Sequence, residues 1–86
     1  MPEISRFYGI VVRPFLDEHL PPHFHAEYGG DEVLVAIGNL AAIAGRLPAR
    51  AMGLLIEWAS LHQAELMVQW ERVRQHEAPS KIDPLP

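Results

Sequence analysis

Protonatable side chains gather in one short segment of this 86-residue chain. Imidazole and carboxylate groups bind metal ions, and imidazoles also exchange protons near neutral pH. The segment is therefore the first place to look for a chemical site. Its protonatable residues are Asp17, Glu18, His19, His23, His25 and Glu27.

The residues from His23 to Tyr28 alternate between polar and apolar types. On a β-strand this pattern places His23, His25 and Glu27 on one face and the apolar residues on the other. Side chains at positions i and i+2 project about 7 Å apart. Two imidazoles at this spacing can therefore reach one divalent ion such as zinc, at about 2.0–2.1 Å from each nitrogen.

A complete metal site needs further ligands beyond His23 and His25. His19 is our preferred third ligand, with Asp17 or Glu27 as alternatives, and His62 could join if the fold brings it near. The same two histidines could instead act as general acid and base. Arg13, or alternatively Arg6, would then stabilise an oxyanion or a phosphate.

A structural interpretation of the histidines is simpler than a metal or catalytic one. His23, His25 and Glu27 can form the polar face of a half-buried strand. A His-x-His pair without a matching distal pair is an incomplete ligand set. The spacing alone therefore favours the structural interpretation.

The first half of the chain predicts a small antiparallel sheet of three to four strands. β-Branched and aromatic residues fill 6–16, so we expect one strand there, which Pro14 ends or places at an edge. Pro21 and Pro22 favour extended backbone before the segment 23–28. Gly29-Gly30 and Gly38-Asn39 are turn signals, and they separate the expected strands 31–37 and 40–46.

From Pro48 the pattern becomes helical, because apolar residues recur at steps of three and four. The stripe predicts one long helix, or two consecutive helices with a bend near 60–63, packed on the sheet. We therefore assign an α+β domain over 1–76. The proline-containing residues 77–86 are expected to form an extended tail.

Two tryptophans lie on the helical stripe with His62 and Leu66 between them. For Trp58 we favour burial against the sheet. Trp70 lies far along the helix beside polar residues, so it is equally compatible with a protein interface, where tryptophan is enriched. The candidate interaction surface is then Trp58, His62, Leu66 and Trp70. For His62 we expect a hydrogen bond with Glu65 or the sheet rather than a ligand role.

Composition limits the classes of function. The formal net charge is −4, which gives no general attraction to nucleic acid, although a local site is compatible with it. The absence of cysteine excludes disulfides and thiolate metal sites. We find no signal peptide and no apolar stretch of about 20 residues, so we expect a cytoplasmic protein without a membrane partner.

Several segments together resemble a bacterial family, the domain of unknown function DUF4160. The resemblance is carried by the start Met1–Val12, by His19–Gly29 with its Pro-Pro-His-Phe-His motif, by Gly45–Pro48, by Glu57-Trp58, Leu61-His62, Glu65-Leu66 and Trp70, and by Lys81–Leu85. Two features depart from the family pattern: Gly53 within the helix, which suggests close packing, and the apolar turn Asn39–Ala42.

The resemblance implies a short protein encoded beside a second small family, DUF2442, in an arrangement similar to toxin–antitoxin pairs. It also makes His23 and His25 look more like a site than their spacing does. We therefore expect a protein-binding module, with a small DUF2442-like partner or a second copy of the chain. The alternatives are a ribonuclease-like or metal-dependent hydrolase that uses His23 and His25, and a metal-sensing or metal-storing protein.

Overall fold

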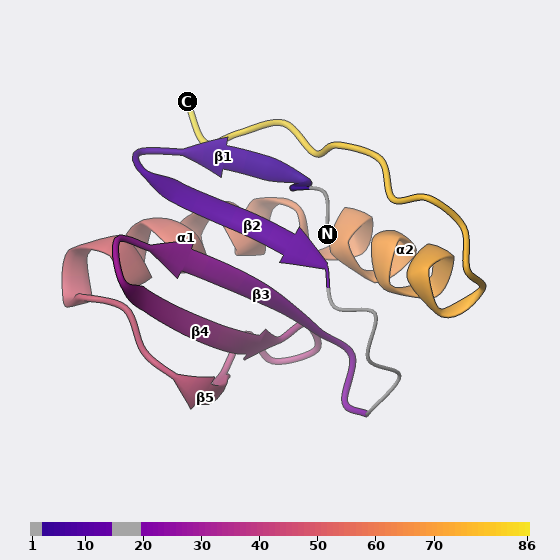
Figure 1. Ribbon diagram of the computed structural model, residues 1–86, viewed down its shortest axis with the longest axis horizontal. Helices are drawn as coiled ribbons and strands as arrows, with labels where there is room; N and C mark the ends of the chain where they lie inside the picture. The colour runs from indigo at the N-terminus through magenta and orange to yellow at the C-terminus, as the bar shows by residue number, and fades with distance from the viewer. Residues whose placement is uncertain (1–2, 15–19) are drawn as a thin grey trace.

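Five antiparallel strands form one sheet in the computed structural model, which describes residues 3–14 and 20–86. The strands are β1 (Ser5–Phe7), β2 (Ile10–Pro14), β3 (His23–Tyr28), β4 (Asp31–Ala36) and β5 (Ala42–Gly45). Each pairs with the next in the chain, so the sheet is a simple meander (Figure 1). The α+β class is confirmed, but the expected three to four strands were too few.

The extra strand arises because the segment 6–16 is not one strand. Tyr8 and Gly9 both have positive φ angles, 49° and 82°, and form the two-residue turn between β1 and β2. A two-residue turn with positive φ at both positions matches the twist of a hairpin. The sequence hid this turn because tyrosine is a typical strand residue and rarely adopts positive φ.

Of the two expected turns, Gly29-Gly30 is confirmed, whereas Gly38-Asn39 lies in a turn that belongs to a longer connection than expected. Tyr28 pairs with Asp31, so Gly29-Gly30 is the whole connection between β3 and β4. Between β4 and β5 the connection spans residues 37–41 rather than two residues. The Asn39 carboxamide accepts a hydrogen bond from the Ala41 N–H, and Leu40 has a φ of 56°. One polar side chain therefore organises this otherwise apolar loop.

Two consecutive helices follow the sheet, α1 (Ala49–Leu61) and α2 (Gln63–Arg74). They are separated at His62, which leaves helical geometry with φ −122° and ψ 23°. The break falls inside the range 60–63 that the sequence indicated. Gln63 donates to the carbonyl of Ile37 at 2.6 Å, which ties the start of α2 to the loop after β4. Neither helix has the length and hydropathy needed to cross a membrane.

The core lies between the helices and one face of the sheet (Figure 1). Alternate strand residues face it, among them Val12, Phe24 and Val35, each 1% exposed or less. Trp58 of α1 is fully buried, with its ring 5.2 Å from Phe7 and 6.1 Å from Phe24. Its expected core position is confirmed. Helices cover only this face of the sheet among the described residues.

The C-terminal segment packs on the domain although it has no helix or strand. Ile82 and Leu85 belong to the core, at 4% and 9% exposure. The Ile82 N–H donates to the Ile4 carbonyl, and the Trp58 indole N–H donates to the Asp83 carbonyl, both at 2.8 Å. Figure 1 shows the segment passing from α2 to β1. It therefore covers the β1 edge of the sheet.

Trp70 does not lie on the surface, so of the two interpretations that the sequence left open, its position agrees with core packing. It is 3% exposed, and its ring lies 5.1 Å from the His23 ring. Because α2 turns at His62, it contacts β2 and β3 rather than projecting past them. Leu66 is also buried, at 1% exposure. The apolar stripe of α2 is thus part of the core.

Candidate functional site

The sheet face opposite the helices carries the polar side chains of the strands. Along β2 and β3, buried and more exposed residues alternate. The side chains of Val12 and Ala26 are buried in the core, so those of Arg13, His25 and Glu27 face away from it. Register places Arg13 opposite His25, and Glu27 opposite Glu32 of β4. We call this side of the sheet the outer face.

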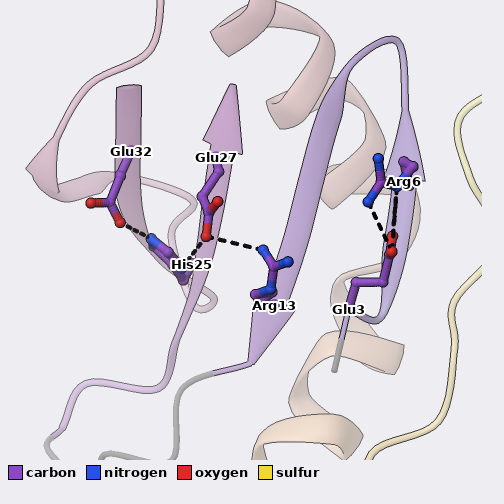
Figure 2. Close-up of polar contacts among 6 residues, drawn as sticks. All are labelled: Glu3, Arg6, Arg13, His25, Glu27 and Glu32. Atoms are coloured by element: carbon purple, nitrogen blue, oxygen red, sulfur yellow. Dashed lines mark hydrogen bonds and ion pairs between the residues drawn. The ribbon is translucent and has the colours of Figure 1, made fainter. Parts of the chain in front are cut away.

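Four of these side chains form a continuous row, which we call the outer-face quartet: Arg13, Glu27, His25 and Glu32. Arg13 donates to Glu27 Oε1 at 3.0 Å, and that oxygen lies 3.8 Å from His25 Nδ1. His25 Nε2 is 2.5 Å from Glu32 Oε2. Figure 2 shows the row crossing three strands. Each ring nitrogen of His25 therefore faces a different carboxylate.

The quartet differs in exposure along its length. The His25 side chain is 12% exposed, whereas Glu27 and Glu32 are 40% and 66% exposed. Because it is mostly buried, the imidazole is held in place by its neighbours. Because it is mostly exposed, the Glu32 side chain has room to change its conformation. Glu27 and Glu32 are directly opposed like charges, an arrangement that destabilises a strand pair unless cationic groups offset it. Arg13 offsets one of the two charges.

A hollow of about 460 Å³ lies beside the quartet. His25 and Glu32 line one part of it, and Ala44, Gly45 and Arg46 line another. Gly45 has a φ of 72°, and a Cβ there would collide with the Glu32 carbonyl oxygen. The close approach of β5 to Glu32 therefore requires glycine at this position.

His23 does not join His25 as a pair. It is 8% exposed, its Nδ1 lies 2.8 Å from the Pro21 carbonyl oxygen, and its ring packs against Trp70. The described groups able to hold a cation comprise His25, Glu27 and Glu32, without His23. His19 lies outside the described residues. His23 is therefore not part of the cation group found among the described residues, and the predicted set of His19, His23 and His25 extends outside those residues.

His62 and Arg6 have partners of their own. His62 Nδ1 is 2.7 Å from Glu65 Oε1, which confirms the hydrogen bond expected between them, and its ring stacks 5.6 Å from Trp58. Arg6 pairs with Glu3 at 3.0 Å near β1 (Figure 2). The hydrogen bond from Arg6 lowers the pKa of Glu3, and the same bond raises the pKa of Arg6.

The quartet can hold or move a proton at His25 and can present carboxylate oxygens to a cation or a basic side chain. A two-histidine acid–base pair needs a second imidazole beside the first, and His23 has a different environment. Among the predicted catalytic residues, Arg13 lies directly opposite His25 in the strand register and also donates to Glu27, whose Oε1 faces His25 Nδ1. The chemistry available on the outer face therefore centres on one imidazole and two carboxylates.

Sequence reasoning missed Glu32 although a signal was present. Once Gly29-Gly30 is accepted as a two-residue turn, counting outward pairs Tyr28 with Asp31 and then Glu27 with Glu32. That count places Glu32 on the same face as Glu27 and His25. The sequence holds no such signal for Arg46. Whether Arg46 comes near the hollow beside Glu32 depends on the irregular register between β4 and β5 near Leu34 and Val35.

The two edges of the sheet differ. The β1 edge is covered by the C-terminal segment, with Ile82 bonded to Ile4 and the Tyr8 hydroxyl donating to the Pro86 carbonyl at 2.7 Å. At the other edge all four residues of β5 are exposed. No other strand of the described chain pairs with the outer side of β5.

Comparison with known proteins supports one assignment. Neither the comparison with curated proteins nor that with solved structures found a match. The family model for the domain of unknown function DUF4160 matches residues 9–71, which is more than half of the chain and includes the outer-face quartet. This chain belongs to the DUF4160 family.

Proposed function

We propose that this chain is a protein-binding module, one component of a two-gene regulatory or toxin–antitoxin-like pair. Its partner is a small protein of the DUF2442-like kind that the family resemblance implies. The binding surface is the β5 edge with the adjoining hollow of the outer face. This surface replaces the helical stripe as the candidate, because Trp58, Leu66 and Trp70 are buried.

The proposal rests on a difference between the two edges of the sheet: one is covered by the chain itself and the other is exposed. The chain covers β1 with its own C-terminal segment and leaves β5 exposed along its whole length. An exposed edge offers backbone N–H and C=O groups that can pair with a strand from another chain. Such edges are usually protected by charged side chains or proline, and the β5 residues Ala42–Gly45 include neither.

Side chains near β5 can add specificity to backbone pairing. Ile43 is 48% exposed, so it offers a partner an apolar contact on this strand. Beside it the hollow presents the Glu32 carboxylate and the Arg46 guanidinium. A partner strand would therefore meet an apolar contact and both signs of charge within one small area, which favours a defined register.

The hydrolase alternative has weaker geometric support. It rests on His25 between two carboxylates, with Arg13 in the same row. His23, its intended second histidine, packs on Trp70. The alternative therefore reduces to chemistry at His25 alone. If wild type shows hydrolase activity and His25→Ala has the same activity, the alternative is wrong.

The test of the proposal compares two charge substitutions at exposed apolar positions. Ile43→Glu places a charge on the β5 edge, and Val68→Glu places the same charge on α2, where Val68 is 53% exposed. Each variant is expressed in the native host and purified under mild conditions. We expect wild type and Val68→Glu to recover the same small protein, identified by mass spectrometry, and Ile43→Glu to lose it.

Two outcomes contradict the proposal. One is recovery of the partner by Ile43→Glu at the wild-type level, since a charge on a paired edge is a strong obstacle to strand addition. The other is a wild-type chain that elutes as a monomer in size-exclusion chromatography and recovers nothing. Thermal unfolding of both variants shows that any loss of partner does not reflect loss of the fold.

A further inference from the structure

Three side chains of the outer-face quartet have the composition of a cation site. His25, Glu27 and Glu32 each offer one ligand atom, and these atoms all lie within 4.8 Å of one another. Imidazole nitrogen with carboxylate oxygens is a ligand set that zinc accepts. We propose that His25, Glu27 and Glu32 bind one divalent cation of the zinc type.

Strand register fixes the relative positions of the three ligands. His25 and Glu27 are two residues apart on β3 and therefore share a face, and Glu32 is directly opposite Glu27 on β4. Both strands lie inside the sheet, with β2 and β5 on their outer sides. The site thus rests on paired backbone rather than on a loop, which limits the reorganisation needed for binding.

The electrostatics of the site also point to a cation. The opposed carboxylates of Glu27 and Glu32 repel each other, and of these two Arg13 donates to Glu27, through Oε1 at 3.0 Å. With a neutral imidazole the quartet carries one net negative charge. A divalent ion between Glu32, His25 and Glu27 would attract both carboxylates and so offset their mutual repulsion.

An ion at His25 Nε2 requires both glutamates to move, because Glu27 Oε1 faces the other ring nitrogen, Nδ1, at 3.8 Å. Two ligands of a tetrahedral zinc lie about 3.3 Å apart when each is about 2.0 Å from the metal. His25 Nε2 and Glu32 Oε2 are now 2.5 Å apart, joined by a hydrogen bond. Replacing the shared proton by the ion therefore requires Glu32 to withdraw by about 1 Å. Its side chain is 66% exposed, so this shift meets little steric resistance.

The ligand set also indicates which cation is preferred. Calcium and magnesium favour all-oxygen sites, and magnesium retains several waters. A nitrogen ligand with two carboxylates suits zinc and other late first-row ions. Three protein ligands leave one tetrahedral position for water or another ligand. His25 and Glu32 border the hollow, which provides room for that fourth group.

The same chain contains a matched control for this proposal. His62 and Glu65 also form a His–Glu hydrogen bond, at 2.7 Å, and Glu65 is 54% exposed. Among the described residues, His62 and Glu65 do not belong to any group of three or more ligands that could hold a cation. Loss of a carboxylate should therefore affect cation binding at Glu32 and not at Glu65.

The experiment is a calorimetric titration of the full-length, tag-free chain with zinc chloride, after removal of metal by chelator. Wild type, Glu32→Gln, Glu27→Gln and Glu65→Gln are compared, because glutamine preserves side-chain size while weakening the ligand. We expect one zinc per wild-type chain and unchanged binding in Glu65→Gln. Affinity should fall by about tenfold or more in Glu32→Gln and Glu27→Gln.

Ring nitrogen shifts of the histidines provide a second measurement. In a heteronuclear spectrum, zinc should move the His25 ring signals first and leave the His62 signals in place, while magnesium chloride should move neither. Absence of stoichiometric zinc binding overturns the proposal. Equal loss of affinity in Glu32→Gln and Glu65→Gln, or a first response at another histidine, overturns it too.

Discussion

Replacing Ile82 by alanine should destabilise the whole domain although the residue lies outside every helix and strand. The side chain is 4% exposed and belongs to the same apolar cluster as Ile4 and Trp58. Removing three carbon atoms costs about 2.4 kcal/mol in transfer free energy, at about 0.8 kcal/mol for each. A cavity term adds to this, so we expect a loss of about 2–4 kcal/mol.

The effect can be separated from loss of backbone contacts. The Ile82 N–H bond to the Ile4 carbonyl is kept by alanine, so only side-chain packing changes. The neighbouring Lys81→Ala variant is the control, because Lys81 is exposed. A stability change within about 0.5 kcal/mol is expected for it.

Urea unfolding followed by tryptophan fluorescence measures both variants. With a slope of about 1–3 kcal/mol per molar urea, the Ile82→Ala midpoint should fall by about 0.7–4 M. The total stability of a domain of this size is about 4–13 kcal/mol, so the variant loses a large share of it. An Ile82→Ala midpoint equal to that of Lys81→Ala would refute the inference that the C-terminal segment is part of the core.

Two further predictions concern glycine and pH. Gly53→Ala should stabilise the protein by about 0.5–1 kcal/mol, because Gly53 lies within α1 and a Cβ there meets nothing within 4 Å. Differential scanning calorimetry should show a higher Tm for Gly53→Ala than for wild type. Gly45→Ala should have a lower Tm, because its Cβ would collide with the Glu32 carbonyl oxygen. A lower Tm for Gly53→Ala would contradict the finding that the space around Gly53 is open. The hydrogen bond from Arg6 lowers the pKa of Glu3, so its stabilising effect is present above the unfolded-state pKa and is lost as pH falls through the folded-state pKa. Urea midpoints of wild type and Glu3→Gln should therefore differ slightly at neutral pH and converge in acid, whereas a gap that widens in acid would have the wrong sign.

Local patterns predicted the parts of the fold that depend on neighbouring residues. The period-two pattern after His23 predicted β3, and Gly29-Gly30 predicted its hairpin with β4. The helical stripe placed Trp58 in the core, and Glu65, three residues after His62, was one of the two hydrogen-bond partners expected for His62. These features succeed because backbone periodicity and turn geometry are set within a few residues.

The failures involve contacts between distant segments or residues that depart from usual preferences. Tyr8 adopts a positive φ in the turn between β1 and β2, within a segment that was expected to be one strand. Gly53 suggested close packing, but its surroundings are open. For Trp70 the core and interface interpretations stayed open, because the pattern of α2 does not reveal that Trp70 lies against His23.

The sequence pointed to the segment that contains His25 and Glu27, and the structure places Glu32 beside these two residues. His25 and Glu27 were identified from β3 alone, and Arg13 was identified from its neighbouring strand. The strand period implied that His23 would share their environment, yet it lies at the end of β3, where Pro21 and Trp70 surround it. Glu32 enters the site only through cross-strand register.

The central claim, that the β5 edge receives a partner strand, is tested most directly by hydrogen–deuterium exchange on the purified complex. Exchange is compared between the free chain and the complex, peptide by peptide. The account predicts slower exchange across Ala42–Gly45 in the complex, with no change in β1, which the C-terminal segment already covers. Unchanged exchange in β5 together with new protection on the exposed side of α1 or α2 would contradict it.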